Sequence, residues 1–463
     1  MNLSLPLLVM SLAAGTATAQ DCSSITIHDL NTLSPPVSSD PHPGTAGTNS
    51  DYELPGKSQL PELGGYRYFV ASTAATGHEL FRTDGTEAGT SLVLDIHPGP
   101  ESSSVSSMIA HNGKLWFTAD DGVHGFELWS SDGTAAGTAL VHDVQPGHLS
   151  GLALVALGKD RQRILGLGND VYFAANDGTH GVELWRSDGT AVRTQMIADL
   201  QAAWLNGVTG ELALAPSGSH VLFTGHWPGS GESLLSTDGS TVSLVHDTPP
   251  GLAPKTPSDL VARLGLVFFS SHGDLYSTDG TPGGTHRLSF HASPTNPKPF
   301  EVDLQDSAEV GGKLLYSGNY DKGWELYITD GTPAGSHLYL DLAPGFGLES
   351  SNPREFVSHA GHVYFLAQDP TYQIYRTNGN WGATQQVTNT SQFPVGMAKF
   401  IGLTPFQGEL YFTPNTSTSF QKNLLIKTDG TTAGTVGVEK TTPSGSAAHL
   451  QAFSSTQLLL RAL

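Results

Sequence analysis

Acidic residues and histidines recur at regular places along this chain, and their types could support metal binding or carboxylate catalysis. An aspartate or asparagine opens a short glycine-containing turn eight times, and a glutamate stands five residues before several of these turns. The residues that open the eight turns are Asp84, Asp132, Asp188, Asp238, Asp279, Asp330, Asn378 and Asp429. Because these residues recur at one spacing, a structural role in a repeat must be considered for each of them before a role in chemistry.

The combination Asp-Gly-Thr also occurs in calcium-binding repeats, so calcium is the first ligand to weigh. Calcium loops alternate acidic ligands closely, as in D-x-[DN]-x-[DN]-G, and no such run occurs in this sequence. An aspartate can instead accept hydrogen bonds from amides one or two residues ahead, while glycine takes a positive φ and the threonine hydroxyl caps the far strand. We therefore interpret the turns as structural and expect no cofactor, with calcium left as the alternative.

A second recurrent turn joins acidic residues and histidines that could contribute to a metal site. Its members are Asp120, Asp121 and His124 in one copy, Asn176, Asp177 and His180 in the next, His78 in the first copy and Asp321 in the sixth. Zinc takes three or four ligands from one neighbourhood, and the members of one copy are too few to supply them. We expect no metal site, and we expect these histidines to bond backbone carbonyls.

Four glutamates share one strand position, and a pair of carboxylates is what a glycosidase needs. They are Glu79, Glu127, Glu183 and Glu325. A catalytic pair is needed only once, so we expect these repeated glutamates to cap strand edges or to accept from backbone amides. The aromatic residue two places after this position is interpreted as packing between repeats. These aromatic residues are Phe81, Trp129, Trp185, Tyr276 and Tyr327. No catalytic residue is assigned.

These residues belong to a repeat of about 49 residues, a period within the range of propeller blades. In the second repeat, alternation predicts strands at 115–119, 126–130 and 139–144. A fourth strand, at 107–111, precedes them and is joined by an asparagine-glycine hairpin turn. A four-stranded sheet cannot bury both of its faces alone. We therefore expect an all-β fold, a β-propeller of eight or nine four-stranded blades.

Four copies of the repeat resemble a known family. ELFRTDGTEAGT (79–90), ELWSSDGTAAGT (127–138), ELWRSDGTAVRT (183–194) and ELYITDGTPAGS (325–336) are similar to the ELWxxDGT repeat family of bacterial secreted proteins. The resemblance covers nearly all of residues 66–438. The other copies depart from the pattern, as SLLSTDGS, DLYSTDGT, IYRTNGNWG and LLIKTDGT. The resemblance implies a propeller-like fold and export, and it implies no particular reaction.

The chain is expected to divide into three parts. Residues 1–19 are predicted to be a signal peptide, because a short apolar core precedes a small-x-small cleavage site. Residues 20–58 hold one strand, at 23–30, and a linker rich in proline and serine. Residues 59–463 are predicted to be the repeat β-propeller domain. Residues 449–463 begin a hairpin that stops early, so we expect N- and C-terminal strands to complete a blade and close the ring.

The composition limits the partners of this protein. The net charge is −21, with 22 lysines and arginines against 43 acidic residues. Nucleic acid is not expected, because phosphate binding needs a basic face. We expect no membrane insertion, since the apolar run at the N-terminus is too short to span a bilayer, and we expect a monomer. Cys22 is the only cysteine and allows no internal disulfide.

The sequence favours a secreted or cell-surface protein with a non-catalytic binding or adhesion function. A surface poor in charge and rich in hydroxyl groups suits carbohydrate or protein ligands, because aromatic faces stack on sugar rings. Trp381 lies in the seventh turn where sibling turns carry threonine or alanine, so it is the candidate ligand-binding residue. The other interpretation is that Trp381 reflects neutral sequence variation in a loop that tolerates substitution. A polysaccharide hydrolase or lyase with a site at the ring axis is the alternative function.

Overall fold

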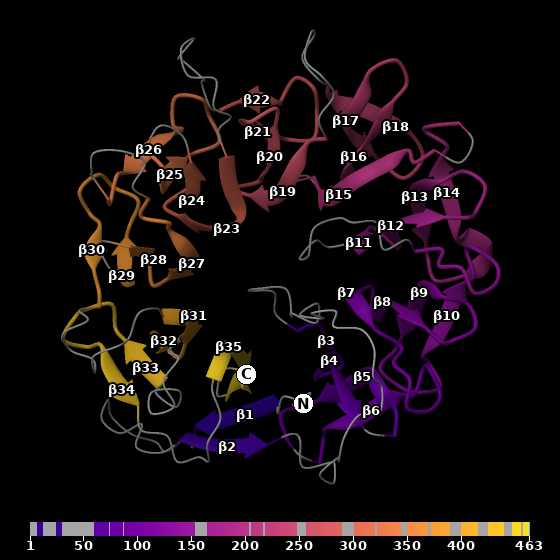
Figure 1. The fold of residues 1–463 in the computed structure, drawn as a ribbon, viewed down its shortest axis with the longest axis horizontal. Coiled ribbons are helices and arrows are strands. Elements are labelled where there is room, and N and C mark those ends of the chain that lie inside the picture. Colours follow the sequence, from indigo (N-terminus) through magenta and orange to yellow (C-terminus); the bar gives the residue numbers. More distant parts are fainter. Residues whose placement is uncertain are drawn as a thin grey trace, which may run out of the picture. The chain divides into compact units, whose positions relative to one another are not determined.

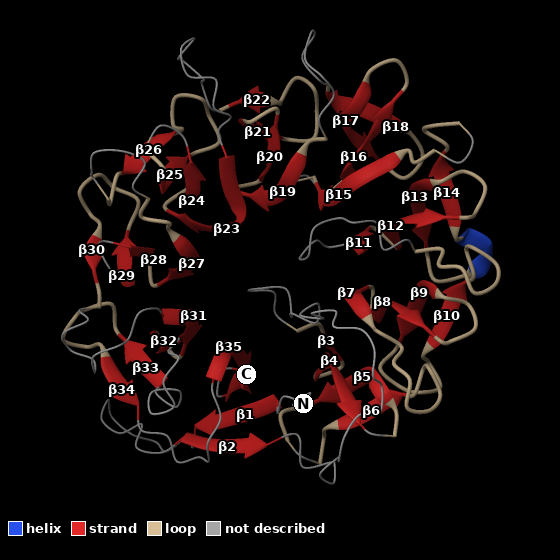
Figure 2. Ribbon diagram, in the orientation of Figure 1, coloured by secondary structure: helices blue, strands red, loops and turns tan. Residues whose placement is uncertain are grey.

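The structure is a computed structural model that describes residues 7–12, 25–29, 60–73, 75–86, 88–152, 164–202, 205–215, 218–247, 256–288, 301–319, 322–343, 350–368, 372–388, 400–414, 425–438, 447–454 and 457–462. Strands make up nearly all of its regular structure. The helical part of the described chain is one 3-10 turn, η1 (Ala191–Arg193), which is the blue element in Figure 2. The predicted all-β class is confirmed.

The described strands form nine four-stranded sheets, and the chain divides into two compact units. Unit 1 holds Met1–Asn2, Ser34–His272 and Tyr276–His286. Unit 2 holds Leu3–Leu33, Gly273–Leu275 and Arg287–Leu463. The single repeat domain over residues 59–463 stays a prediction.

Sheets 1 to 4 lie in unit 1, and the division between the units falls within the chain segment of sheet 5. Sheet 1 holds β3 (Glu62–Leu63), β4 (Tyr66–Thr73), β5 (Gly77–Thr83) and β6 (Ser91–Leu94). Sheet 2 holds β7 (Ser106–His111), β8 (Lys114–Asp120), β9 (Phe126–Ser131) and β10 (Ala139–His142). Sheet 3 holds β11 (Ile164–Leu167), β12 (Asp170–Asn176), β13 (Val182–Ser187) and β14 (Gln195–Ala198). Sheet 4 holds β15 (Val208–Leu214), β16 (Val221–Trp227), β17 (Gly231–Thr237) and β18 (Val242–His246). Sheet 5 holds β19 (Ser258–Arg263), β20 (Leu266–Ser271), β21 (Asp274–Thr278) and β22 (His286–Arg287).

Sheets 6 to 9 lie in unit 2. Sheet 6 holds β23 (Glu301–Val310), β24 (Lys313–Asn319), β25 (Trp324–Thr329) and β26 (His337–Leu340). Sheet 7 holds β27 (Arg354–His359), β28 (His362–Gln368), β29 (Tyr372–Thr377) and β30 (Gln385–Gln386). Sheet 8 holds β31 (Phe400–Phe406), β32 (Glu409–Pro414), β33 (Leu425–Thr428) and β34 (Val436–Val438). Sheet 9 holds β1 (Leu7–Leu12), β2 (Ile25–Asp29), β35 (Ala447–Ser454) and β36 (Gln457–Ala462).

Neighbouring sheets pack through the two faces of their second strands. On β8, Trp116 points into the core shared with sheet 3, while Leu115 and Phe117 point into the core shared with sheet 1. This follows from the alternation of side chains along a strand. On β28 of unit 2, Tyr364 faces sheet 8 and Phe365 faces sheet 6. Within each unit the sheets follow chain order and consecutive sheets lie side by side (Figure 1). Four-stranded sheets packed face to face in this way are β-propeller blades.

The loops that join strands within a sheet fix where side chains of the repeat lie. Between β7 and β8, Asn112 (φ 50°) and Gly113 (φ 69°) both take positive φ, as the predicted hairpin turn requires. The strand predicted at 139–144 is shorter than expected, since β10 ends at His142. A bulge between Leu140 and His142 breaks the ladder there, because an extra residue in one strand leaves it unpaired and bends the chain.

Sheet 9 is built from both ends of the chain. β2 pairs with β1, β1 pairs with β36, and β36 pairs with β35. The predicted blade of N- and C-terminal strands is confirmed. We expected one N-terminal strand in this blade, and the structure has two, β1 and β2. The additional strand is β1, which lies inside residues 1–19, the predicted signal peptide. Cleavage of that segment and closure of the blades into one ring stay predictions.

Candidate ligand-binding sites

The Asp-Gly-Thr turns are held by their own side chains. Oδ1 of Asp132 accepts from the amide (2.9 Å) and the hydroxyl (2.7 Å) of Thr134, and this hydroxyl accepts from the amide of Gly137 (3.1 Å). The hydrogen bond from the Thr134 hydroxyl holds the pKa of Asp132 below its usual range. The same pair of bonds from a threonine or serine recurs at Asp84, Asp188, Asp238, Asp279, Asp330 and Asp429. The predicted hydrogen bonds from backbone amides to the aspartates are confirmed, and calcium binding stays a hypothesis.

The glutamates of the ELW position are fully buried and bind the backbone of the loop that leads to the next sheet. Glu127 accepts from the amides of Val144 (3.2 Å), Gln145 (3.3 Å) and Gly151 (2.7 Å). Burial raises the pKa of Glu127 to about 7. Equivalent bonds to two loop amides are made by Glu79, Glu183 and Glu325. These four are called the clamp glutamates below. The prediction that they accept from backbone amides is confirmed, and none of them is exposed to a substrate.

The histidines of the second recurrent turn bind aspartates. Nδ1 of His124 lies 2.7 Å from Oδ2 of Asp121, and Nδ1 of His180 lies 2.7 Å from Oδ2 of Asp177. The hydrogen bond with Asp121 raises the pKa of His124. The expected bonds from these two histidines to backbone carbonyls are therefore wrong. Oδ1 of each aspartate accepts from the backbone of the turn, which leaves Oδ2 facing the imidazole.

The remaining residues of these turns also have local partners. Oδ1 of Asp120 accepts from the amide of Gly122 at 2.7 Å, and Asn176 makes the same bond to Gly178 at 2.7 Å. His78 lies on β5, and Asp321 lies outside the described residues. In the described part of the chain, no three histidine, cysteine, aspartate or glutamate side chains gather as a metal site would require.

The aromatic residues two places after the clamp position are packing residues, as predicted. Their exposed fractions lie between 5% and 8%, and they are Phe81, Trp129, Trp185, Tyr276 and Tyr327. Trp129, for example, packs in the core between sheets 1 and 2 with Phe117. These rings are therefore closed to ligands.

Trp381 differs from those rings because 80% of its surface is exposed. Its turn joins β29 and β30 and keeps the sibling geometry, since Oδ1 of Asn378 accepts from the amide of Asn380 at 3.0 Å. One edge of the indole meets Tyr339 of sheet 6, with ring centroids 6.4 Å apart and planes at 80°. The Tyr339 hydroxyl donates to the carbonyl of Asn380. A turn built like its siblings thus presents an aromatic face to solvent.

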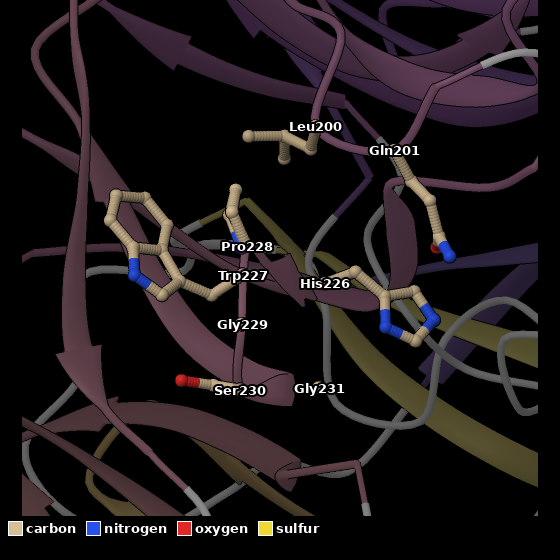
Figure 3. Close-up of a pocket in the computed structure, with 8 residues that line it drawn as sticks. All are labelled: Leu200, Gln201, His226, Trp227, Pro228, Gly229, Ser230 and Gly231. Carbon is tan, nitrogen blue, oxygen red and sulfur yellow. The ribbon is translucent and has the colours of Figure 1, made fainter.

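A pocket in unit 1 was not predicted from the sequence. It lies between the loop after β14 and the turn that joins β16 to β17, and its volume is about 310 Å³. It is lined by Leu200, Gln201, His226, Trp227, Pro228, Gly229, Ser230 and Gly231. Figure 3 shows Trp227 and His226 extending to opposite sides of β16, with Leu200 and Gln201 across the space from the turn. The available signal was the turn sequence WPGSG, which replaces the acidic residue and histidine of the two preceding repeats.

Comparisons with known proteins identify no family. No family model matches this chain, and no curated protein matches it. Among solved structures, the chain is similar to the computationally designed Ika8 protein at 15% identity, over 78% of this chain and 97% of that protein, with a TM-score of 0.39. It is similar to a puromycin hydrolase at 13% identity, over 82% of this chain and 62% of that enzyme, with a TM-score of 0.37. It is also similar to the GH74 xyloglucanase from Xanthomonas campestris at 12% identity, over 83% of this chain and 67% of that enzyme, with a TM-score of 0.41.

The chain spans less than two thirds of the puromycin hydrolase, and none of these similarities bears on function. Within the described residues, no helix has the length and apolar content needed to cross a membrane.

Proposed function

We propose that this chain is a secreted, non-catalytic binding protein of the ELWxxDGT type that recognises carbohydrate through exposed turns of its blades. The observation that carries the proposal is the indole of Trp381, which is 80% exposed in a turn that needs no aromatic residue for its own structure. No sibling turn has an aromatic residue at this place, where the residues are Glu87, Ala135, Ala191, Thr241, Pro282, Pro333 and Thr432. Indole faces stack on the apolar faces of sugar rings.

The distribution of exposed apolar residues favours carbohydrate over a protein partner. In the described residues the exposed large apolar side chains are Val123, Leu149, Val192, Leu205, Trp381 and Val436. Single exposed residues of this kind are ordinary, and a protein interface needs a contiguous patch of several hundred Å². A sugar ring needs a smaller surface, and it can stack on a single exposed aromatic ring.

The glycosidase alternative receives no support from the clamp glutamates. Each has an exposed fraction of 0% and uses its carboxylate to hold a loop. A pair of carboxylates that flanks a substrate must be open to it. Export follows from the predicted signal peptide and is part of the proposal.

A glycan array combined with a reducing-sugar assay tests the proposal. We expect the exported protein to be retained on at least one glycan without producing new reducing ends, equally with calcium and with a chelator. Trp381→Ala should weaken retention about fivefold, since a stacked ring contributes on the order of 1 kcal/mol. Val192→Ala is the matched control, because Val192 is also an exposed apolar residue of a sibling turn, at 92%. Equal retention by Trp381→Ala would remove that residue from the site, and new reducing ends would overturn the non-catalytic function.

A further inference from the structure

The turn that carries Trp381 departs from its siblings after its first hydrogen bond. In six of the other repeats, a threonine or serine hydroxyl at the end of the third strand bonds the hydroxyl seven residues further on, at 2.6–2.8 Å. In the seventh repeat, Thr377 instead bonds the hydroxyl of Tyr339 from sheet 6, at 2.8 Å. The hydroxyl of Thr384, seven residues after Thr377, is buried and has no hydrogen-bond partner among the described residues. Tyr339 thus replaces the partner that the siblings use.

The backbone of this turn is also shifted by one residue. In the second repeat, the amide of Thr138 donates to the carbonyl of Ala135 at 3.3 Å. In the seventh repeat, the amide of Ala383 donates to the carbonyl of Asn380 at 3.1 Å, and both of these residues lie one position earlier in the turn than their sibling counterparts. The carbonyl of Asn380 also accepts from the hydroxyl of Tyr339. This hydroxyl therefore bonds the turn at two points.

Tyr339 is itself a departure from the repeat. It occupies the bulge in the last strand of sheet 6, between the paired residues Leu338 and Leu340. The ring is 4% exposed and lies in the core between sheets 6 and 7. The residues at the corresponding bulges of sheets 1 to 4 are aliphatic and have no hydroxyl, namely Val93, Val141, Ile197 and Val245. Tyr339 and Trp381, which depart from the repeat in different sheets, are therefore in contact with each other.

This contact restricts the exposed indole. An exposed side chain samples several rotamers, and a ligand that immobilises it must offset the lost entropy. One edge of the Trp381 indole lies against the buried ring of Tyr339, an arrangement that aromatic pairs favour. The backbone just before the indole is tied by the Tyr339 hydroxyl. An indole held in this way has lost part of its freedom before a ligand binds, so binding costs less entropy.

We propose that Tyr339 is the positioning residue of the Trp381 site, and that it holds one face of the indole toward solvent for stacking on a sugar ring. The ligand in this inference rests on the proposed function, whereas the order of the indole can be measured without a ligand. The turn leaves the buried hydroxyl of Thr384 unpaired, which is costly, and in exchange Trp381 is oriented. Neutral variation in a tolerant loop would not require a buried partner from another sheet.

Nuclear magnetic resonance relaxation of the full chain, labelled with ¹⁵N at the tryptophan indoles, tests the positioning role without a ligand. The Trp381 resonance is assigned as the one that Trp381→Phe removes. We expect its order parameter to be about 0.85 in the wild type, and below about 0.6 in Tyr339→Val, which introduces the residue of the sibling bulges. Tyr339→Phe, which removes only the hydroxyl, should lie between the two, and it decides the question if Tyr339→Val does not fold. An unchanged order parameter in every folded variant would overturn the proposal.

Tyr364→Phe is the matched control for these variants. Its hydroxyl also lies against a turn of the next sheet, since a carbon added to Gly430 of sheet 8 would lie 2.3 Å from it. That turn does not carry Trp381. Tyr364→Phe should therefore leave the order parameter of the Trp381 indole unchanged.

Retention on the glycan array relates the order of the indole to binding. Tyr339→Val should weaken retention about threefold, because a mobile indole must be immobilised by the ligand, and Tyr364→Phe should not weaken it. In the Trp381→Ala background, Tyr339→Val should have no further effect, which a general loss of stability would not produce. Unchanged retention of Tyr339→Val, or a further loss in that background, would overturn the positioning role. If no glycan retains the wild type, the proposed function fails, and the relaxation measurement still decides the role of Tyr339.

Discussion

At the scale of single residues, five of the Asp-Gly-Thr turns contain a glycine that leaves no room for a side chain, because the carboxylate of the first aspartate lies beside it. A carbon added to Gly137 would lie 2.1 Å from the carboxyl carbon of Asp132. Gly137→Ala should lower the melting temperature through this collision, and Asp132→Ala should lower it through the loss of two bonds from Thr134. In the double variant the collision is absent, so its loss should be smaller than the sum of the single losses. Thermal denaturation of the four proteins measures this coupling.

The control for that cycle is Gly283→Ala, since a carbon added there would meet no atom within 4 Å. Gly283→Ala alone should change the melting temperature little. Asp132→Ala should lower the melting temperature by the same amount whether or not Gly283→Ala is also present. Additive losses in the Asp132 and Gly137 cycle would show that the carboxylate does not occupy the space assigned to it.

Turn residues could be predicted from the sequence because their partners are close in the chain. Asp132 bonds Thr134, two residues ahead, so local rules suffice. The clamp glutamates were predicted as amide acceptors, but the loop amides that they hold lie 17 and 24 residues away for Glu127. The pocket beside Trp227 could not be predicted, because it is lined by residues of two different repeats, such as Leu200 and Trp227, that are far apart in the sequence.

At the scale of elements, the clamp glutamates couple the loops between sheets to pH. Burial raises the pKa of Glu127 from 4.5 to about 7, so the folded state keeps a proton that the unfolded chain releases in that interval. The stability contributed by this proton is fully present below pH 4.5 and is lost as pH rises through about 7. Relative to Glu127→Gln, which has no ionisable group there, the wild type should lose up to about 3 kcal/mol of unfolding free energy across this window.

Chemical denaturation of both proteins at several pH values measures that difference. The comparison at each pH removes contributions that the two proteins share, including the effect of the Asp121 hydrogen bond, which is the largest cause of the raised pKa of His124. Glu101→Gln, at an exposed position in the loop after β6, is the control and should follow the wild type at every pH. Parallel curves for wild type and Glu127→Gln would show that burial of Glu127 does not hold a proton.

Strand identity could be predicted from alternation, whereas strand ends could not. β8 and β9 lie where the pattern of apolar residues places them, because a buried second strand needs apolar residues on both faces. β10 ends early since the backbone beyond it turns toward Glu127, and the amide of Val144 bonds that carboxylate instead of a neighbouring strand. The end of this strand is thus decided by a side chain from the strand beside it.

At the scale of the whole molecule, sheet 9 joins the two ends of the chain. β1 pairs with β2 on one side and with β36 on the other, and β1 belongs to the segment that signal cleavage would remove. The C-terminal hairpin of β35 and β36 is present with or without that cleavage. It also contacts sheet 8, because β35 lies against β31. The contribution of this hairpin to the stability of unit 2 can therefore be measured on the full chain and on the chain without residues 1–19.

Deleting residues 450–463 removes β36 and most of β35, and it should lower the melting temperature far more than deleting residues 35–48, an equal length of the predicted linker. The reason is that β36 carries ladders to both β1 and β35, and a strand edge or sheet face left open loses its hydrogen bonds and its apolar contacts. Differential scanning calorimetry of the two deletions beside the intact chain measures the effect. If the two deletions lowered the melting temperature equally, sheet 9 would add no stability to unit 2, and the prediction that N- and C-terminal strands close the ring would lose its support.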